Sequence, residues 1–262
     1  MAITSERSKP RIGVVSGRYP ASRFESHINH RAYCARHGYT YIYCNWPTGA
    51  SNRYMNKIEY IKAYYDLFDY IFWIDDDAFF IRLEQGLEDF LPKGDSFLSI
   101  CSSPVVNGIF TYVSSGQFMI QCSPTGRSFI DATQQVDLRQ VRAWWSDDLG
   151  HFTRGDQDCF VYLMKADDRF AQYDRHSYHA FNSRVDDLLV GKDVFLLHIT
   201  GTPQVKQKRY QRVQRYLARG PSLLPTEEAA RWNLLLTPTP WSLVSTIPGR
   251  VVRRLRRIIR AR

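Results

Sequence analysis

Long apolar runs are missing from this sequence of 262 residues. No stretch approaches the roughly 18 apolar residues that a membrane-spanning helix needs, and residues 1–10 lack the apolar centre of a secretory signal. We therefore expect a protein that is neither integral to a membrane nor exported by that route. Cysteine is also scarce: five residues, widely spaced, with no C-x-x-C pair. This argues against a zinc knuckle or a disulfide framework and favours a reducing compartment.

The common nucleotide-binding fingerprints are absent too. The sequence has no G-x-G-x-x-G and no Walker motif, which argues against a dinucleotide dehydrogenase or a P-loop enzyme. A strand over 11–16, a helix after the capping pattern of Ser22 and Glu25 that ends before Gly38, and a strand over 39–44 are nevertheless typical of a nucleotide-binding α/β half.

The residues that are present indicate a globular chain with localised positive charge. Hydrophobic residues make up 44% and charged residues 23%, so we expect one large folded α/β domain. Of the net charge of +9, residues 250–262 contribute +7 and residues 206–219 contribute +6, which leaves −4 for the rest. This distribution predicts a local contact with an anionic surface and no nucleic-acid partner.

The stretch 70–80 is the centre of the pattern. Five apolar residues, Tyr70–Ile74, predict a strand buried on both faces of a mostly parallel sheet, and Asp75, Asp76 and Asp77 follow directly. Carboxylates at such a strand end need a compensating cation, and open α/β sheets bind ligands there. We interpret the triplet as a divalent-metal site; the alternative is a solvated acidic turn.

Two further segments are candidates for donor binding. Asn56 and Lys57 lie in the first turn of a helix predicted over 55–68, where a cation and free amides suit a phosphate. The alternative for Lys57 is an exposed lysine. Strands are predicted over 97–101 and 110–113, and small residues including Ser115 and Gly116 interrupt the pattern before 118–120. This interruption brings the backbone close to a ligand, or it is a plain bulge.

An aromatic and acidic loop follows at 144–151. Flat rings suit the apolar face of a sugar and carboxylates accept from its hydroxyls, so the sequence predicts an acceptor-binding site; the alternative is that the tryptophans cap the core. The residues concerned are Trp144, Trp145, Asp147 and Asp148.

The last predicted strand, 193–199, contains His198 and leads into Gly201. A lone histidine there is either structural or the nitrogen ligand that favours Mn²⁺ at a carboxylate site. A basic helix over 203–219, a helix over 226–236 and a proline-containing linker come next. In the tail, Val251, Val252, Leu255, Ile258 and Ile259 form one stripe of a basic amphipathic helix.

Such a helix is predicted to lie in a membrane interface. The alternatives for the tail are docking on the protein's own surface or a disordered nucleic-acid-binding segment. We expect a peripheral protein on the cytoplasmic, inner face of a bacterial plasma membrane.

These features together resemble a GT-A-type glycosyltransferase, and most closely the galactosyl-, xylosyl- and mannosyltransferases of glycosyltransferase family 34. The resemblance covers about residues 11–206. It rests on Asn56-Lys57 before Trp73-Ile74-Asp75-Asp76-Asp77-Ala78, which is similar to the family's W-x-D-x-D-A signature, and on Ser115-Gly116, Asp156-Gln157 and His198-x-x-Gly201 in the family's order. Two positions differ: Ser115 replaces Asn or Ala, and the lysine after the histidine lies eight positions on, at Lys206.

The resemblance implies a role for each matched residue. Asp75 would hold the nucleotide ribose or a metal water, Asp77 would bind Mn²⁺ (or Mg²⁺), and His198 would complete the metal shell. Asp156 and Gln157 would lie near the anomeric carbon of a retaining enzyme. The implied donor-binding set is Val15, Ser16, Gly17, Asn56, Lys57, Asp75, Asp76, Ser115, Gly116 and Lys206.

The expected fold is a Rossmann-like GT-A domain over 11–220 with a mixed, mostly parallel central sheet flanked by helices. A flexible segment (1–10) precedes it, and a helical extension with a linker (221–246) and the amphipathic helix (247–262) follow. The expected activity is metal-dependent transfer of a hexose or pentose from a nucleotide-sugar, expected to be a UDP-sugar, to a glycan or lipid-linked glycan acceptor in bacterial surface polysaccharide synthesis.

Two rival functions stay open. A membrane or polyanion-binding module explains the tail, but it does not explain the ordered motifs. A haloacid-dehalogenase phosphatase also begins with Asp-x-Asp, but it needs a small or β-branched residue where this chain has Phe79.

Overall fold

The structure is a computed structural model that describes residues 9–21, 23–50, 52–106, 108–232 and 234. The chain divides into two compact units, Met1–Leu223 and Leu224–Arg262. The second unit contains α8 (Thr226–Arg231), which is shorter than the predicted helix over 226–236. The predicted tail helix, 247–262, lies outside the described residues, so it stays a prediction. No helix in the described part of the chain is long and apolar enough to cross a membrane.

A six-stranded sheet forms the centre of the first unit, in the order β2-β1-β3-β6-β5-β7. The β1–β2, β1–β3 and β5–β7 pairs are parallel, whereas β3–β6 and β5–β6 are antiparallel. The predicted fold class, a mixed and mostly parallel central sheet flanked by helices, is therefore confirmed. The strands are β1 (Ile12–Gly17), β2 (Thr40–Cys44), β3 (Tyr70–Ile74), β5 (Leu98–Cys101), β6 (Ser114–Gln121) and β7 (Asp174–His176).

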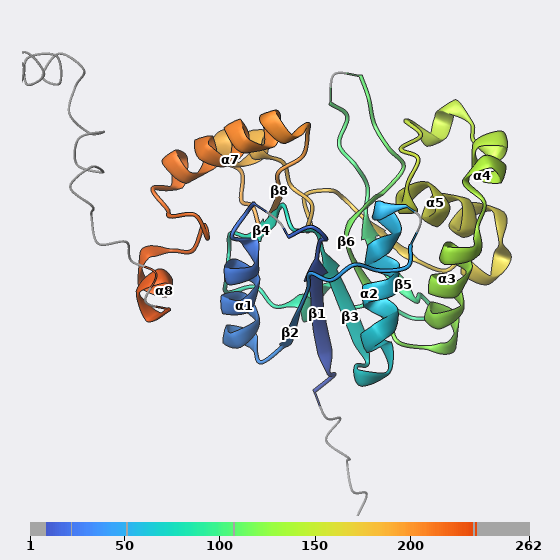
Figure 1. Cartoon of the computed structure of the whole chain (residues 1–262), viewed down its shortest axis with the longest axis horizontal. Helices are drawn as coiled ribbons and strands as arrows, with labels where there is room; N and C mark the ends of the chain where they lie inside the picture. Colours follow the sequence, from blue (N-terminus) through green and yellow to red (C-terminus); the bar gives the residue numbers. More distant parts are fainter. Residues whose placement is uncertain (1–8, 22, 51, 107, 233, 235–262) are drawn as a thin grey trace, which may run out of the picture. The chain divides into compact units, whose positions relative to one another are not determined.

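Helices cover both faces of this sheet (Figure 1). Alternation along β3 sends Ile71 and Trp73 into one core with residues of α2, α3 and α5. Phe72 lies on the opposite face and contacts Phe80 and Phe181, at ring-centroid distances of 6.3 and 5.8 Å. The helices are α1 (Ser26–His37), α2 (Asn56–Tyr64), α3 (Pro124–Gln135), α4 (Leu138–Trp144), α5 (Asp156–Ala166), α6 (Val185–Leu189) and α7 (Pro203–Leu217).

Local signals explain several helix ends. The helix α1 stops at Gly38, whose φ of 74° is the left-handed conformation that glycine adopts easily. At α3, the side chain of Ser123 accepts a hydrogen bond from Gly126 N, and Pro124 takes the first helical position. The predicted capping pattern of α1 is wrong, because the helix begins at Ser26 after Glu25, which makes no side-chain cap. Short 3-10 helices span Arg53–Met55, Tyr65–Leu67, Leu87–Phe90, Asp147–Leu149 and Asp168–Phe170.

A second sheet has two strands and contains the candidate ligand His198. Strand β4 (Ala78–Phe80) pairs antiparallel with β8 (Leu196–His198), and Ala78 is opposite His198. The strand predicted over 193–199 therefore exists in shorter form, outside the central sheet.

The sequence misplaced the start of one strand. Residues 110–113 form no strand, and β6 begins at Ser114, inside the predicted interruption. On the β5 side, however, the register shifts between Ile100, which is opposite Phe118, and Cys101, which is opposite Ser114. Residues 115–117 thus bulge away from β5 while Gln117 still pairs with Ile74 of β3, so the predicted irregularity is real.

Candidate active site

The topology brings three chain segments to one edge of the central sheet. Strands β1 and β3 are parallel and end together, with Ser16 opposite Ile74. Strand β6 runs the other way and begins at this edge, where Gly116 O accepts a hydrogen bond from Asp75 N (2.8 Å). The ends of β1 and β3 and the start of β6 therefore surround the acidic triplet, at the edge where such sheets bind ligands.

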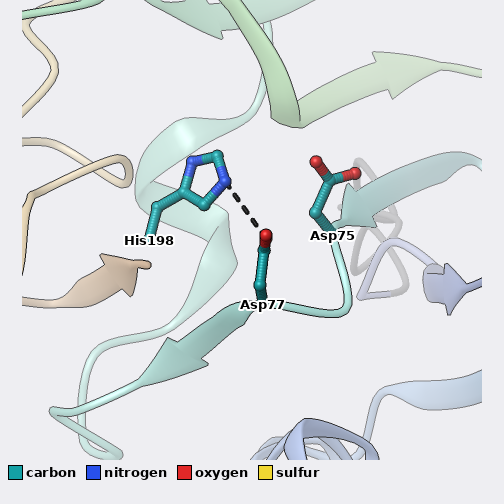
Figure 2. A group of neighbouring side chains, drawn as sticks. All are labelled: Asp75, Asp77 and His198. Atoms are coloured by element: carbon teal, nitrogen blue, oxygen red, sulfur yellow. Dashed lines mark ion pairs between the residues drawn. The ribbon is translucent and has the colours of Figure 1, made fainter. Parts of the chain in front are cut away.

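Asp75, Asp77 and His198 converge at this edge (Figure 2). One potential ligand atom from each residue lies within 4.8 Å of the others. Asp75 and Asp77 flank the turn between β3 and β4, and His198 arrives from β8 because β4 and β8 pair. Two carboxylates and one imidazole form a mixed oxygen and nitrogen donor set that suits Mn²⁺ as well as harder divalent ions.

The surroundings of this cluster fit a bound cation. Asp77 is 3% exposed, and its Oδ1 accepts no hydrogen bond from the described residues. Gly116 leaves the space free, since a Cβ there would lie 2.7 Å from His198 Cε1 and 3.1 Å from Asp75 Oδ2. The backbone of β6 thus approaches the cluster as closely as it does because residue 116 has no side chain.

Two side chains contact the carboxylate of Asp77. His198 Nε2 lies 3.2 Å from Oδ1, and the Lys206 ammonium contacts Oδ2. Burial alone would raise the pKa of Asp77, but the adjacent His198 imidazole and Lys206 ammonium outweigh it and hold the pKa well below its usual value. The carboxylate is therefore ionised, as a metal ligand has to be.

Lys57 is buried, which excludes the exposed-lysine alternative. Its Nζ lies 3.0 Å from Asp156 Oδ2 and 3.4 Å from Asp75 Oδ1, and it donates to Ser115 O (2.9 Å). Burial alone would lower its pKa, but Asp156 and Asp75 raise it, so the ammonium stays charged. Lys57 thereby connects the first turn of α2 to β3, β6 and α5.

The other matched residues of β6 and α5 are close to this network. Ser115 N donates to Gln157 Oε1 (3.2 Å), and Asp156 is 3% exposed beside Lys57. The indole of Trp73 donates to Asp75 Oδ1 (2.8 Å), which fixes the first carboxylate of the signature. The structure therefore brings Lys57, Asp75, Ser115, Asp156 and Gln157 together.

The remaining donor candidates lie at the same edge or beside it. Val15 is fully buried in the core, so only its backbone can face a ligand, and Ser16 is 1% exposed. Gly17 lies against β2, where a Cβ would be 2.1 Å from Cys44 O. Asn56 Oδ1 accepts from Thr48 Oγ1 (2.7 Å), and Asp76 Oδ2 lies 3.4 Å from Arg18 Nη1. Their roles toward a donor stay predictions.

The acceptor candidates lie in a different segment, at the C-terminal end of α4 and directly after it. Trp145 is partly buried against the core and donates to Gly150 O (2.8 Å), which favours the core-capping alternative for this residue. Trp144 is 37% exposed, and Asp147 and Asp148 are exposed in a 3-10 helix. Acceptor binding by this segment stays a prediction.

Sequence reasoning missed three side chains of the site. Arg18 contacts Asp76, and Asn182 and Arg184 contact the ring of His198. Residues 182–184 belong to no helix or strand, so no periodicity marked them. Arg18 directly follows the donor candidate Gly17, and this position is the one signal that was available.

Comparisons with known structures identify the fold. The chain is similar to a glycosyltransferase involved in the glycosylation of the major capsid of PBCV-1, with a TM-score of 0.59 and 15% identity. The match covers 76% of this chain and 99% of that one. It is also similar to the apo form of the glycosyltransferase GlyE of Streptococcus pneumoniae TIGR4, with a TM-score of 0.51 and 12% identity, over 86% of this chain and 63% of that one.

A family model agrees with the structural likeness. The model of the galactosyl transferase GMA12/MNN10 family matches residues 19–102, which include α2 and the acidic triplet. The chain resembles a GT-A glycosyltransferase of family 34. No curated protein sequence matches it significantly.

The family match and the fold together support a glycosyltransferase enzyme. In that setting, Asp75 and Asp77 fit the Asp-x-Asp motif of such enzymes. Ser115, Gly116, Asp156, Gln157 and His198 lie beyond the matched segment, and the structure nevertheless places them beside the motif. A glycosyltransferase implies a nucleotide-sugar donor and a glycan acceptor.

Proposed function

We propose that this glycosyltransferase moves a hexose or pentose from a UDP-sugar to a glycan or lipid-linked glycan acceptor, with retention of configuration and with a divalent ion, Mn²⁺ or Mg²⁺. The observation that carries the proposal is the convergence of Asp75, Asp77 and His198 at the ligand-binding edge of a GT-A fold. Asp77 and His198 would hold the ion, and Asp75 would hold the ribose of the nucleotide or a water molecule bound to the ion. A divalent ion there stabilises the negative charge of a departing diphosphate without a proton donor.

The protein's own groups supply position and charge. Lys57 is fixed by three acceptors, so it presents one positive charge at the donor edge without rotating. Asp156 is engaged with Lys57, which favours a role in holding that lysine. The amide of Gln157, which is partly exposed beside Ser115 N, is the group we assign next to the anomeric carbon. Lys206 would move from Asp77 to the diphosphate.

The acceptor site and the cellular location are proposed from exposed side chains and from charge. Trp144 and its exposed neighbours Asp147 and Asp148 offer an aromatic face and acceptors for sugar hydroxyls. The arginines of 250–262 suit an anionic lipid surface, so we place the enzyme peripherally on the inner face of a bacterial plasma membrane. There a lipid-linked intermediate of a surface polysaccharide would reach it.

Hydrolysis of a panel of nucleotide-sugars tests this function. We expect release of nucleotide from UDP-sugars with Mn²⁺ and none with chelator. Asp77→Asn should lose at least about 100-fold in turnover, because it removes charge that holds the ion. Asp69→Asn is the matched control, because Asp69 lies directly before β3, at the end away from the site, and its carboxylate pairs with Arg11 (3.0 Å).

Far-ultraviolet circular dichroism checks that both variants are folded. Full metal-dependent activity in a folded Asp77→Asn protein would refute the metal assignment. Turnover that persists in chelator would refute metal dependence. The family match and the fold favour transfer over the polyanion-binding and phosphatase alternatives, and a panel without any nucleotide release would restore them.

A further inference from the structure

Residues 182–184 run alongside strand β8 and contact the candidate metal ligand His198 at Nδ1, the ring nitrogen that does not face Asp77. Ser183 forms a parallel bridge with Leu197; its N donates to Leu196 O (3.1 Å), and its O accepts from His198 N (2.8 Å). Side chains alternate along an extended segment, so Asn182 and Arg184 share the side opposite to Ser183. Both contact the ring of His198.

The amide of Asn182 has one possible orientation. Its Oδ1 accepts from Arg184 Nη1 (2.5 Å), and its Nδ2 donates to Ser102 O (3.3 Å). A guanidinium only donates and a carbonyl only accepts, so both contacts place the amide oxygen toward Arg184. Asn182 is 0% exposed, and Arg184 also donates to its backbone oxygen (2.8 Å), so this arrangement is tightly held.

The fixed amide determines which nitrogen of His198 carries a proton. Asn182 Oδ1 lies 3.0 Å from His198 Nδ1, closer than Arg184 Nη1 at 3.3 Å. The two N–H groups of Arg184 Nη1 donate to Asn182 O and Asn182 Oδ1, so neither remains for Nδ1, and Nδ1 donates to Asn182 Oδ1. The other nitrogen, Nε2, points to Asp77 Oδ1 (3.2 Å), on the side where Asp75 completes the cluster.

We propose that Asn182 is a positioning residue for the metal site: it holds His198 as the Nδ1-protonated ring with Nε2 directed at the ion, and Arg184 fixes the amide that does so. The proposal rests on the metal site of the proposed function. A hydrogen-bond acceptor behind a ligating histidine sets its orientation and raises its basicity, and loss of such an acceptor weakens metal binding about 10- to 100-fold.

Mn²⁺ titration calorimetry on the full chain without nucleotide tests this role. We expect Asn182→Leu, which keeps the volume but removes the acceptor, to bind Mn²⁺ about 10- to 100-fold more weakly. Asn182→Asp, whose carboxylate also accepts from Nδ1, should bind within about threefold of the wild type. The visible absorption bands of bound Co²⁺ should change in the leucine variant and return in the aspartate variant.

Asn29→Leu is the matched control, because Asn29 is also 0% exposed but its amide binds the backbone of Phe80. It should lower the Tm and leave Mn²⁺ affinity unchanged. If Asn182→Leu does not fold, Asn182→Ala replaces it in the comparison with Asn182→Asp.

His198→Ala separates this proposal from the proposed function. Unchanged Mn²⁺ affinity in His198→Ala would refute the metal site itself. Weakened affinity in His198→Ala combined with wild-type affinity in Asn182→Leu, or with equal weakness of the leucine and aspartate variants, would refute the role of Asn182 alone.

Discussion

At the scale of single residues, the site is a set of charges that compensate one another. Three carboxylates, Asp75, Asp77 and Asp156, face Lys57, Lys206 and His198 at the end of a buried strand. Without these partners, the burial of Asp77 and Asp156 would be very costly. The same neutralisation means that an incoming divalent ion competes with a side chain of the protein.

Lys206 is that competitor, since its ammonium contacts a carboxylate that would bind the ion. We predict that Lys206→Met binds Mn²⁺ about tenfold more tightly without nucleotide, because the removed charge repels the ion at close range. At saturating Mn²⁺ the same variant should bind UDP about tenfold more weakly, because the diphosphate loses a cation. Calorimetry measures both constants.

Lys208→Met is the control for Lys206, because this lysine is exposed on the same helix α7. It should leave both constants within about twofold of the wild type, as expected for a screened surface charge. A Lys206→Met protein that weakens Mn²⁺ and UDP together would instead indicate a structural role for the lysine.

At the scale of elements, the sequence specified the central strands well and their connections poorly. Tyr70–Ile74, an unbroken apolar run before three aspartates, is a fully paired strand as predicted. The start of β6 was missed because Ser115 and Gly116 have low strand propensity, and only the pairing with β3 makes them extended. Asn182 and Arg184 were missed because they lie in no helix or strand. The bridge between Ser183 and Leu197 of β8 determines their position, and no sequence pattern indicates it.

The burial of Lys57 could not be inferred either. Lys57 looks like a solvated residue in the sequence, yet it is 8% exposed because two carboxylates from other elements meet it. Asp75, Asp77 and His198 were found from the sequence pattern, since the acidic triplet follows one apolar run and His198 lies near the end of another, whereas Asp156 came from the family resemblance alone.

The contact between α1 and β4 predicts a pH dependence of stability. His30 on α1 is 0% exposed and bonds Ala78 O (2.8 Å). Burial lowers its pKa to about 3 from an ordinary 6.5, although the bond to Ala78 acts in the opposite direction. Below pH 6.5 the unfolded chain binds a proton at His30 that the folded chain does not bind. The free energy of unfolding therefore decreases as the pH is lowered, by about 2 kcal/mol at pH 5.

Urea unfolding between pH 7.5 and 5 in wild type and His30→Gln measures this effect. Glutamine keeps a hydrogen-bond donor but does not titrate, so the free energy of unfolding of His30→Gln should decrease less steeply as the pH is lowered. The carboxylates are common to both proteins, so their effect cancels in the difference between the two. Equal slopes in the two proteins would show that His30 is not the titrating group.

At the scale of the whole molecule, positive charge is concentrated in two segments, 206–219 and 250–262. Residues 250–262 carry seven arginines, whereas the chain outside the two basic segments is net negative. We predict that the full chain floats with anionic liposomes and that a chain ending at Thr246 stays behind. Each basic residue near an anionic leaflet contributes about 1 kcal/mol, so even partial engagement suffices at physiological salt.

A full-length variant with the seven arginines replaced by glutamine is the matched control. It should remain unbound, and about 0.5 M salt should release the wild type because exposed charges are screened. Equal flotation of the full and shortened chains would show that the tail is not the anchor.

The pairing of β4 with β8 also determines when the site can exist during folding. Asp77 and Lys206 are 129 positions apart in the chain, and His198 joins them only after this two-stranded sheet has closed. Closure of such a long loop is an expensive, late event, so partly folded chains cannot capture the ion. An ion that binds only the completed fold adds about 2.7 kcal/mol of stability at 100 times its Kd. A protein loaded with such an ion would therefore resist proteolysis longer than an empty one, and the proposed metal site would link the lifetime of the protein to the supply of the ion.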